Sequence, residues 1–129
     1  MNAVAIDIKD ILLTKGLGYS FGQNLFIGRM PEQPNECTCI FDIAGAVPDL
    51  TMTAQQYMRD GVQFIVRANN YLGAMGKAQD ILEKLQGLTN IEQGGMFYTL
   101  IRTNMTPNVL DWDENNRIYV IFSMEAQRR

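Results

Sequence analysis

The chain has 129 residues, of which 47% are hydrophobic and 19% are charged, and its formal net charge is −3. This balance is typical of a globular protein and excludes a disordered chain, and the length favours one domain spanning residues 1–129. The eleven Lys and Arg residues are scattered, so they form no basic stripe of the kind that holds nucleic-acid phosphates.

The N-terminal segment is predicted to be a helix over residues 3–15, because its apolar residues recur at helical spacing. Asn2 is its expected cap, Gly16 is its expected end, and Asp7 is expected to point mostly outward. The segment has no basic leader, and no uncharged apolar run in the chain is long enough to span a membrane. We therefore expect a protein made and kept in a cytoplasm, or in a particle assembled there, without membrane contact.

Two short strands follow, at residues 25–29 and 37–43, and the prolines between them favour a turn. We expect these strands to form a hairpin. Cys37 and Cys39 share one face of the second strand with a geometry that suits a disulfide poorly, so they are predicted to be reduced, half-buried thiols. Asp42 lies on the opposite face of this otherwise apolar strand.

Residues 44–56 form the longest segment without a clear period, and long loops inside compact domains are often functional. Val47, Leu50 and Met52, if exposed, favour contact with a partner, and Asp49 lies among them. The alternative is that these apolar side chains fold back onto the core.

Residues 62–88 carry the clearest structural signals. Apolar residues at every second position predict a strand with one face on the core and Arg67 on the other face. Asn69 or Asn70 is the expected cap of a following helix, and Gly87 is its expected left-handed end. The helix has one apolar stripe at helical spacing, formed by Tyr71, Met75, Ala78, Leu82 and Leu85.

Gly73 and Gly76 lie inside this predicted helix, where each costs about 1 kcal/mol relative to alanine. This cost favours a close approach of the helix to the sheet or to a neighbouring subunit. The pair is not a phosphate-binding loop, because it lacks the glycine and lysine spacing of such loops and lies within a helix instead of before one.

The last third of the chain is predicted to form strands at 91–93, 96–103 and 117–125, with a loop from 106 to 116 that contains Trp112. Alternate residues of the final strand share one apolar face, formed by Ile118, Val120, Phe122 and Met124. The predicted fold class is α+β, with a mixed, mostly antiparallel sheet packed against two helices in the order α-β-β-β-α-β-β-β.

No set of residues in the sequence indicates chemistry. The sequence has no histidine for a catalytic triad or metal cluster, and two cysteines with no second pair make no zinc site. Asp111, Asp113 and Glu114 form the densest carboxylate cluster, but Arg117 stands where a calcium loop would need another ligand. A solvated hairpin turn is the simpler interpretation, and we expect no catalytic residue, no cofactor and no metal.

The order and spacing of these elements resemble the small tail-terminator, or minor capsid, proteins of long-tailed bacteriophages. The matching segments follow the N-terminal helix at residues 40–45, 62–71, 78–89, 100–102 and 113–117, before a terminal strand. They cover most of the chain and carry no catalytic residues. The sequence departs from the family at Ala44-Gly45-Ala46, where a run richer in glycine and proline is usual.

The resemblance implies an α+β fold whose subunits close into a homo-oligomeric ring, a hexamer, that caps the tail tube and provides the surface joining the DNA-filled head. Its partners would be other copies of the chain, the tail tube protein and a head-completion or connector protein. It would reside in the virion tail after assembly in the host cytoplasm. DNA would pass through the lumen without being read, and an acidic balance is compatible with that passage.

Two other functions stay open, namely a head-side connector and a small cytoplasmic ligand-binding or enzyme-accessory domain that uses residues 44–56 as a lid. Asp42 and Arg67 could pair with each other or face a partner. Arg67→Glu is predicted to disrupt assembly more than folding, because Arg67 is expected on the non-core face. The residues predicted to contact other subunits or partners are Asp42, Val47, Asp49, Leu50, Met52, Arg67, Gly73, Gly76 and Trp112.

Overall fold

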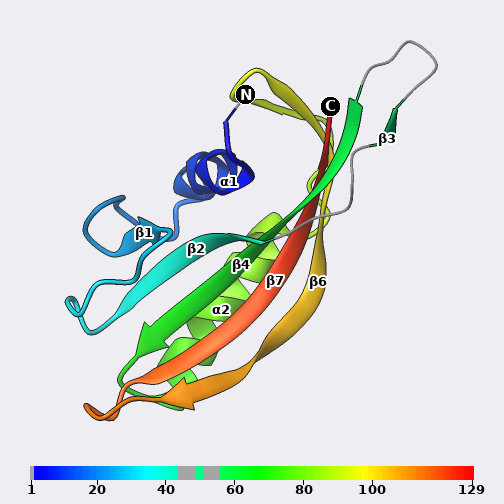
Figure 1. Ribbon diagram of the computed structural model, residues 1–129. Helices are drawn as coiled ribbons and strands as arrows, with labels where there is room; N and C mark the ends of the chain where they lie inside the picture. Colours follow the sequence, from blue (N-terminus) through cyan, green and yellow to red (C-terminus); the bar gives the residue numbers. More distant parts are fainter. Residues whose placement is uncertain (1, 44–48, 51–55) are drawn as a thin grey trace.

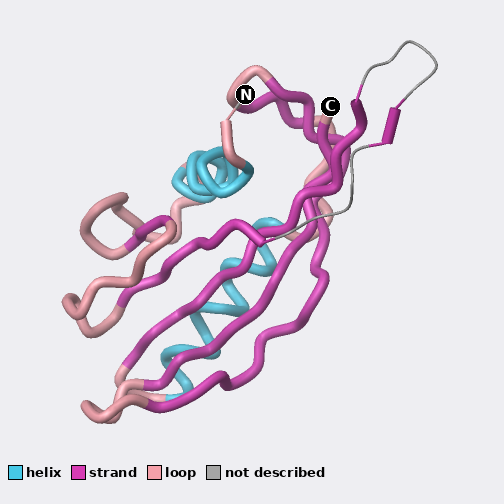
Figure 2. The backbone as a smooth tube through the Cα atoms, in the orientation of Figure 1, coloured by secondary structure: helices cyan, strands magenta, loops and turns pink. Residues whose placement is uncertain are grey.

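The computed structural model describes residues 2–43, 49–50 and 56–129. These residues form two helices and a mixed, mostly antiparallel sheet, which confirms the predicted α+β class (Figures 1 and 2). The elements in chain order are α1 (Val4–Leu13), β1 (Leu25–Ile27), β2 (Cys37–Ile43), β3 (Asp49–Leu50), β4 (Gln56–Ala68), α2 (Tyr71–Leu85), β5 (Ile91–Gln93), β6 (Met96–Trp112) and β7 (Ile118–Arg128).

The sheet has the strand order β1-β2-β4-β7-β6-β5, and the short β3 pairs with β4. Its centre is made of β4, β7 and β6, three long antiparallel strands that follow one another across the sheet (Figure 1). Every pair of strands is antiparallel except β1 and β2. Long strands suit a chain that is rich in alternating apolar residues, because each strand then buries one complete face.

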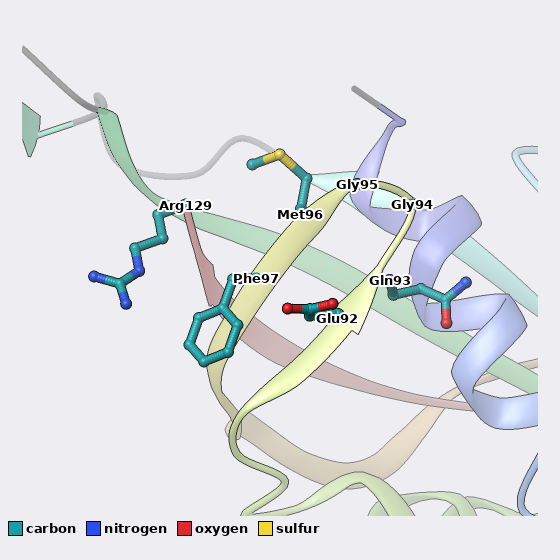
Figure 3. A pocket seen from close by; sticks show the side chains of 7 residues that line it. All are labelled: Glu92, Gln93, Gly94, Gly95, Met96, Phe97 and Arg129. Atoms are coloured by element: carbon teal, nitrogen blue, oxygen red, sulfur yellow. The ribbon is translucent and has the colours of Figure 1, made fainter.

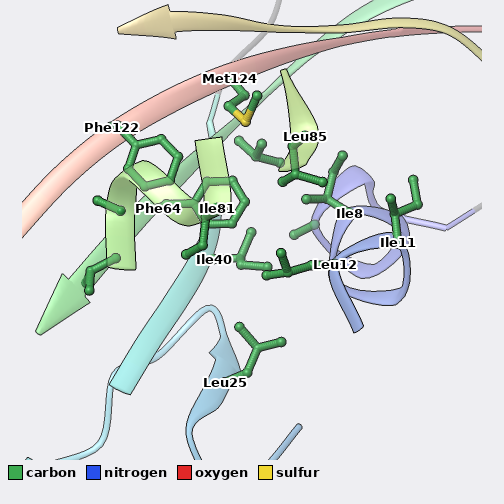
Figure 4. Close-up of a cluster of buried hydrophobic side chains, with 14 of the residues drawn as sticks. Ile8, Ile11, Leu12, Leu25, Ile40, Phe64, Ile81, Leu85, Phe122 and Met124 are labelled. Atoms are coloured by element: carbon green, nitrogen blue, oxygen red, sulfur yellow. The ribbon is translucent and has the colours of Figure 1, made fainter. Parts of the chain in front are cut away.

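One hydrophobic core lies between the sheet and both helices (Figure 4). Phe64 of β4 and Phe122 of β7 are direct partners in the sheet, and their rings stack with centroids 4.8 Å apart. Ile8 of α1 and Ile81 of α2 are fully buried in the same core. Because both helices pack against the same side of the sheet, the opposite side has no helix over it among the described residues.

The alternation predicted for β4 and β7 is confirmed. Val62, Phe64, Val66 and Ala68 are fully buried, and each is the sheet partner of a buried residue on β7. Paired residues on neighbouring strands point to the same face, so the two strands contribute one continuous apolar surface to the core. These partners on β7 are Met124, Phe122, Val120 and Ile118.

Helix α2 begins as predicted, because the side chain of Asn70 accepts a hydrogen bond of 2.6 Å from the backbone N–H of Gly73. Gly87 follows the helix with φ +81°, the left-handed conformation that favours glycine. The buried stripe is rotated from the predicted one, since Tyr71 is 49% exposed at the first turn. The residues that face the core are Ala74, Ala78, Ile81 and Leu85.

The predicted hairpin between the first two strands is wrong, because β1 and β2 are parallel. Residues 28–36 return the chain to its starting end before β2 begins. The carbonyl oxygens of this connection accept hydrogen bonds from Arg67 and Arg117, which hold the loop beside the sheet. A proline-rich segment has few backbone donors of its own, so it depends on such side-chain partners.

Helix α1 also differs from the prediction at its start. Ala3 is the N-terminal cap and makes no side-chain bond, and the predicted cap Asn2 donates instead to Asp7. Asp42 of β2 accepts a hydrogen bond of 3.0 Å from the Ala5 N–H, so a distant strand supplies a carboxylate to this helix end. Asp7, expected outside, is fully buried.

Strand β6 is longer than predicted and includes residues 106–112, which the sequence indicated as loop. Register shifts interrupt its pairing with β7 at four places, and Pro107 lies within this irregular part. Bulges and proline are typical of strands at a sheet edge. Proline is tolerated there because no neighbouring strand requires a hydrogen bond from its backbone nitrogen. β5 pairs with residues 96–98 of β6, and Leu88 forms a bridge with Ile101, so the part of β6 beyond these residues is such an edge among the described strands.

Candidate partner-binding surface

The predicted contact residues are not gathered at one place in the fold. Asp42 binds the start of α1 and therefore does not pair with Arg67, which is the sheet neighbour of Cys37 at the other end of β2. Val47 and Met52 lie outside the described residues. Asp49 and Leu50 form β3, whose backbone pairs with the start of β4.

Arg67 is buried, with 2% of its surface exposed, although it lies on the side of β4 that faces away from the core. Its guanidinium donates to the carbonyl oxygens of Glu32, Pro34 and Asn35 at 3.2, 2.5 and 3.1 Å. It also lies over the ring of Tyr119, with 5.9 Å between the guanidinium carbon and the ring centroid. Arg67 therefore lies on the non-core face, as predicted, but the 28–36 loop covers it there.

Gly76 and Trp112 are exposed, whereas Gly73 is half-buried at the first turn of α2. A Cβ at Gly73 would lie 3.0 Å from the capping oxygen of Asn70, so the local cap explains that glycine. A Cβ at Gly76 would meet nothing within 4 Å, so no close approach to the sheet requires it. Contact with a neighbouring subunit stays a prediction for these three residues.

A polar cluster lies beside Trp112, at the turn between β6 and β7. The buried guanidinium of Arg117 donates to Asp113 at 2.7 Å and to the side chain and carbonyl of Glu32 at 2.8 and 2.6 Å. Tyr119 donates to the same Asp113 carboxylate at 3.0 Å. The cluster joins the 28–36 loop to the turn, and the sequence indicated it only as a solvated hairpin.

Asp113 is held as a carboxylate in this cluster. Partial burial raises the pKa of Asp113, but hydrogen bonds from the backbone and side chain of Arg117 and from Tyr119 outweigh it and lower the pKa to about 2. The group is therefore ionised at every physiological pH and is unsuited to proton transfer. The Asp113 carboxylate is therefore a structural partner of Arg117.

Large apolar side chains are exposed around this turn, and we call them the tip patch. Trp112 is the sheet partner of Ile118, which is the partner of Ala68, so the patch lies where β4 passes into α2 (Figure 1). Monomeric proteins rarely leave several large apolar residues exposed together without a binding role. The tip patch consists of Tyr71, Leu72, Val109, Leu110 and Trp112, which are between 42% and 81% exposed.

A shallow hollow of about 570 Å³ lies against the tip patch, lined by Leu110, Trp112, Tyr119 and the carboxylates of Asp111, Asp113 and Glu114. A second hollow of about 410 Å³ surrounds the β5–β6 turn (Figure 3). Its charged residues are Glu92 and Arg129, and the Arg129 guanidinium lies 5.2 Å from the Phe97 ring centroid. Neither hollow brings an acid, a base and a nucleophile together.

The far end of the sheet holds a second buried polar cluster. The Tyr98 hydroxyl donates to Asp7 at 2.5 Å, and Arg128 lies 3.5 Å from the same carboxylate. Arg128 also donates to Asp60 at 2.7 Å and to the carbonyl of Asn2 at 2.9 Å. Burial, together with the bond to Asp7, raises the pKa of Tyr98. Every polar group is paired, so the cluster ties both ends of the chain to the sheet.

In the described part of the chain, no three Cys, Asp or Glu side chains are arranged to hold a metal ion. Cys37 and Cys39 are free and buried, and burial raises the pKa of the Cys39 thiol to about 11. Within the described ranges, neither helix has the length and apolar character that a membrane crossing requires.

Comparison with known proteins gives two matches of different kinds. No curated protein matches the sequence. A solved chain from the "Virion of native gene transfer agent (GTA) particle" has the same fold, with a TM-score of 0.67 and 11% identity over 98% of this chain and 94% of that chain. A family profile described as "Bacteriophage tail terminator protein" matches residues 4–128. The chain therefore belongs to the bacteriophage tail terminator family, which consists of structural proteins of the virion tail.

Proposed function

We propose that residues 1–129 act as one tail-terminator domain and that copies of it form a homo-oligomeric ring, a hexamer. This ring closes the end of the phage tail tube and presents the surface to which the head joins. The observation that carries the proposal is the family match over residues 4–128, nearly the whole chain. The fold similarity to a chain of a gene transfer agent virion supports it.

The described surface supports a structural subunit without catalytic activity. The tip patch exposes Tyr71 and Trp112, and aromatic side chains are the type enriched at the centres of protein interfaces. The buried side-chain nitrogen and oxygen atoms of the described residues all have hydrogen-bond partners, so these polar groups hold the fold together. We propose that the function depends on these contact surfaces.

The proposed partners are other copies of the chain, the tail tube protein and a head-completion or connector protein. DNA passes through the ring without specific binding. The net charge of −3 supports this last point, because a subunit with an acidic balance does not hold phosphates as a basic one does.

Native mass spectrometry and sedimentation velocity test the ring directly. The purified chain is measured over a range of concentrations, alone and with tail tubes, and a discrete closed oligomer of six subunits is expected. A chain that stays monomeric at high concentration, with tail tubes present as well, would contradict the proposal.

Mixing the purified protein with headless tails and with tailless heads tests whether it binds the tail or the head at the head–tail joint. A tail terminator binds the tails first, and the completed tails then join heads. Binding to tailless heads alone would assign the chain to the head side as a connector.

A further inference from the structure

The contact between neighbouring subunits can be assigned to two surfaces of the chain, if the proposed ring is correct. We infer that the tip patch of one subunit docks against a second exposed apolar surface on α1 and the loop after it, in the next subunit. The inference rests on the proposed ring and adds to it the pair of surfaces that meet. It commits to a second copy of this chain as the occupant of the tip patch.

The second surface, which we call the N-terminal patch, consists of Ile6, Leu13 and Phe21, which are 37%, 36% and 52% exposed. Ile6 and Leu13 are seven residues apart on α1 and therefore lie on one side of the helix. The ammonium of Lys9, between them on that side, lies 4.8 Å from the centroid of the Phe21 ring. The helix and the following loop thus form one continuous surface, away from the tip of the sheet (Figure 1).

The charges around the two patches are opposite. At the tip, the guanidinium of Arg117 pairs with Glu32 and Asp113, and that of Arg67 binds carbonyl oxygens of the 28–36 loop. Two further carboxylates, Asp111 and Glu114, line the hollow beside the tip patch, are exposed and form no ion pair within the described residues. On the other side, Lys15 follows the end of α1 and Arg29 follows β1, whose Leu25 forms a bridge with Phe21 of the N-terminal patch. Lys15 and Arg29 likewise have no ion-pair partner in the described part of the chain, and Lys9 is paired with Asp10.

These charges favour a head-to-tail contact between unlike patches. Two tips facing each other would bring Asp111 and Glu114 of both copies together, and such like-charge contacts disfavour association. A tip facing an N-terminal patch brings the unpaired carboxylates towards Lys15 and Arg29 and buries apolar side chains on both sides. Contacts between two different surfaces generate rings when the rotation closes, which is the assembly proposed above.

Charge exchange tests this pairing. One variant reverses the tip charges (Asp111→Lys and Glu114→Lys), and the other reverses the N-terminal charges (Lys15→Glu and Arg29→Glu). Each variant alone then has like charges on its two patches. We expect each to need at least about a tenfold higher concentration than the wild type for half-maximal assembly in sedimentation velocity at low salt.

Restoration is the decisive measurement. When the two variants are mixed, every tip again meets a patch of opposite charge, so an alternating ring forms near the wild-type concentration. A chain that carries all four substitutions is expected to assemble alone for the same reason. Restored assembly also shows that the variants are folded, and Lys84→Glu, an exposed reversal on α2 outside both patches, is the matched control.

The outcomes separate this inference from the proposed function. If the wild type forms a ring and both reversed variants form it equally well, the pairing of patches is wrong and the ring stands. If the variants fail and their mixture fails as well, the loss does not come from complementary charge, and the pairing is again overturned. A monomeric wild type would overturn the ring and the pairing together.

Discussion

Arg117 and Arg128 stand at the two ends of β7, and both are buried, yet their surroundings differ. Arg128 lies against Asp7, which is fully buried, and against the hydroxyl of Tyr98. Arg117 binds Glu32, whose side chain is 73% exposed, and Asp113 at the edge of the tip. Removing Arg128 would leave a buried carboxylate without a partner, whereas an exposed partner of Arg117 could form hydrogen bonds with water instead. The two arginines therefore differ in how much their loss should reduce stability.

The difference assigns separate tasks to the two ends of the sheet. At the Arg128 end, residues distant in sequence form one closed polar cluster that fixes α1 against the sheet. At the Arg117 end, the cluster fixes a loop and a turn and leaves the tip patch exposed beside them. We therefore expect changes at the first end to affect folding, and changes on the exposed surface of the second to affect assembly.

Arg128→Met is the largest expected effect on stability. It leaves the buried carboxylate of Asp7 without its positive partner, which costs about 3–5 kcal/mol of unfolding free energy. Urea denaturation measures the loss, with Arg129→Met as the adjacent, exposed control. A loss below about 1 kcal/mol would show that the remaining hydrogen bonds suffice for Asp7 and would remove the contrast between the two ends.

Arg67→Glu is expected to destabilise the fold by about 3 kcal/mol, because a buried carboxylate would replace the donor of three hydrogen bonds to loop carbonyls. This revises the expectation, based on the position of Arg67 on the non-core face, that assembly suffers more than folding. Thermal unfolding and sedimentation should be measured on the same preparation. Normal unfolding combined with lost assembly would restore the earlier interpretation.

The tip cluster is expected to weaken in acid. The folded-state pKa of Asp113 is about 2, below the value of about 3.9 for a free aspartate. Its contribution is therefore complete above about pH 4 and is lost as the pH falls towards 2. Unfolding of the wild type and of Asp113→Asn should be compared at pH 7, 4 and 2. Their stabilities should converge only at the lowest pH, and a constant difference would exclude this titration.

Arg102→Ala is the smallest expected effect. Arg102 binds Glu125 across β6 and β7 at 2.8 Å, but its side chain is 53% exposed. Exposed ion pairs contribute about 0–1 kcal/mol, and salt screens them. Urea denaturation in low and high salt measures the effect. A cost close to that of Arg128→Met would show that burial does not separate strong from weak arginine pairs in this sheet.

Much of the core could be predicted from the sequence because its signals are local. Alternation in β4 and β7 identified the buried faces, and Asn70 and Gly87 marked the ends of α2. The N-terminal helix followed from apolar spacing in the same way. Periodicity reports which side of an element is apolar, and in a small α+β domain that side is the core.

The candidate contact surface was predicted only in part. Trp112 is exposed as part of the tip patch, but Arg67 is covered by a loop that lies about thirty residues earlier in the chain. Tyr71 was placed in the buried stripe of α2 and is instead exposed beside Leu72. For an apolar residue in the first turn of a helix, the neighbouring sequence does not indicate whether a distant element covers it.

The sequence by itself determined the fold class, the apolar faces of the long strands and the ends of α2, because propensity, capping and periodicity act within a few residues. Only the tertiary structure decided the parallel pairing of β1 with β2, the burial of Asp7 and Arg67, and the length of β6. Each of these depends on hydrogen bonds between segments far apart in the chain. A polar side chain in an apolar element shows that a partner is needed, and only the fold shows which partner it has.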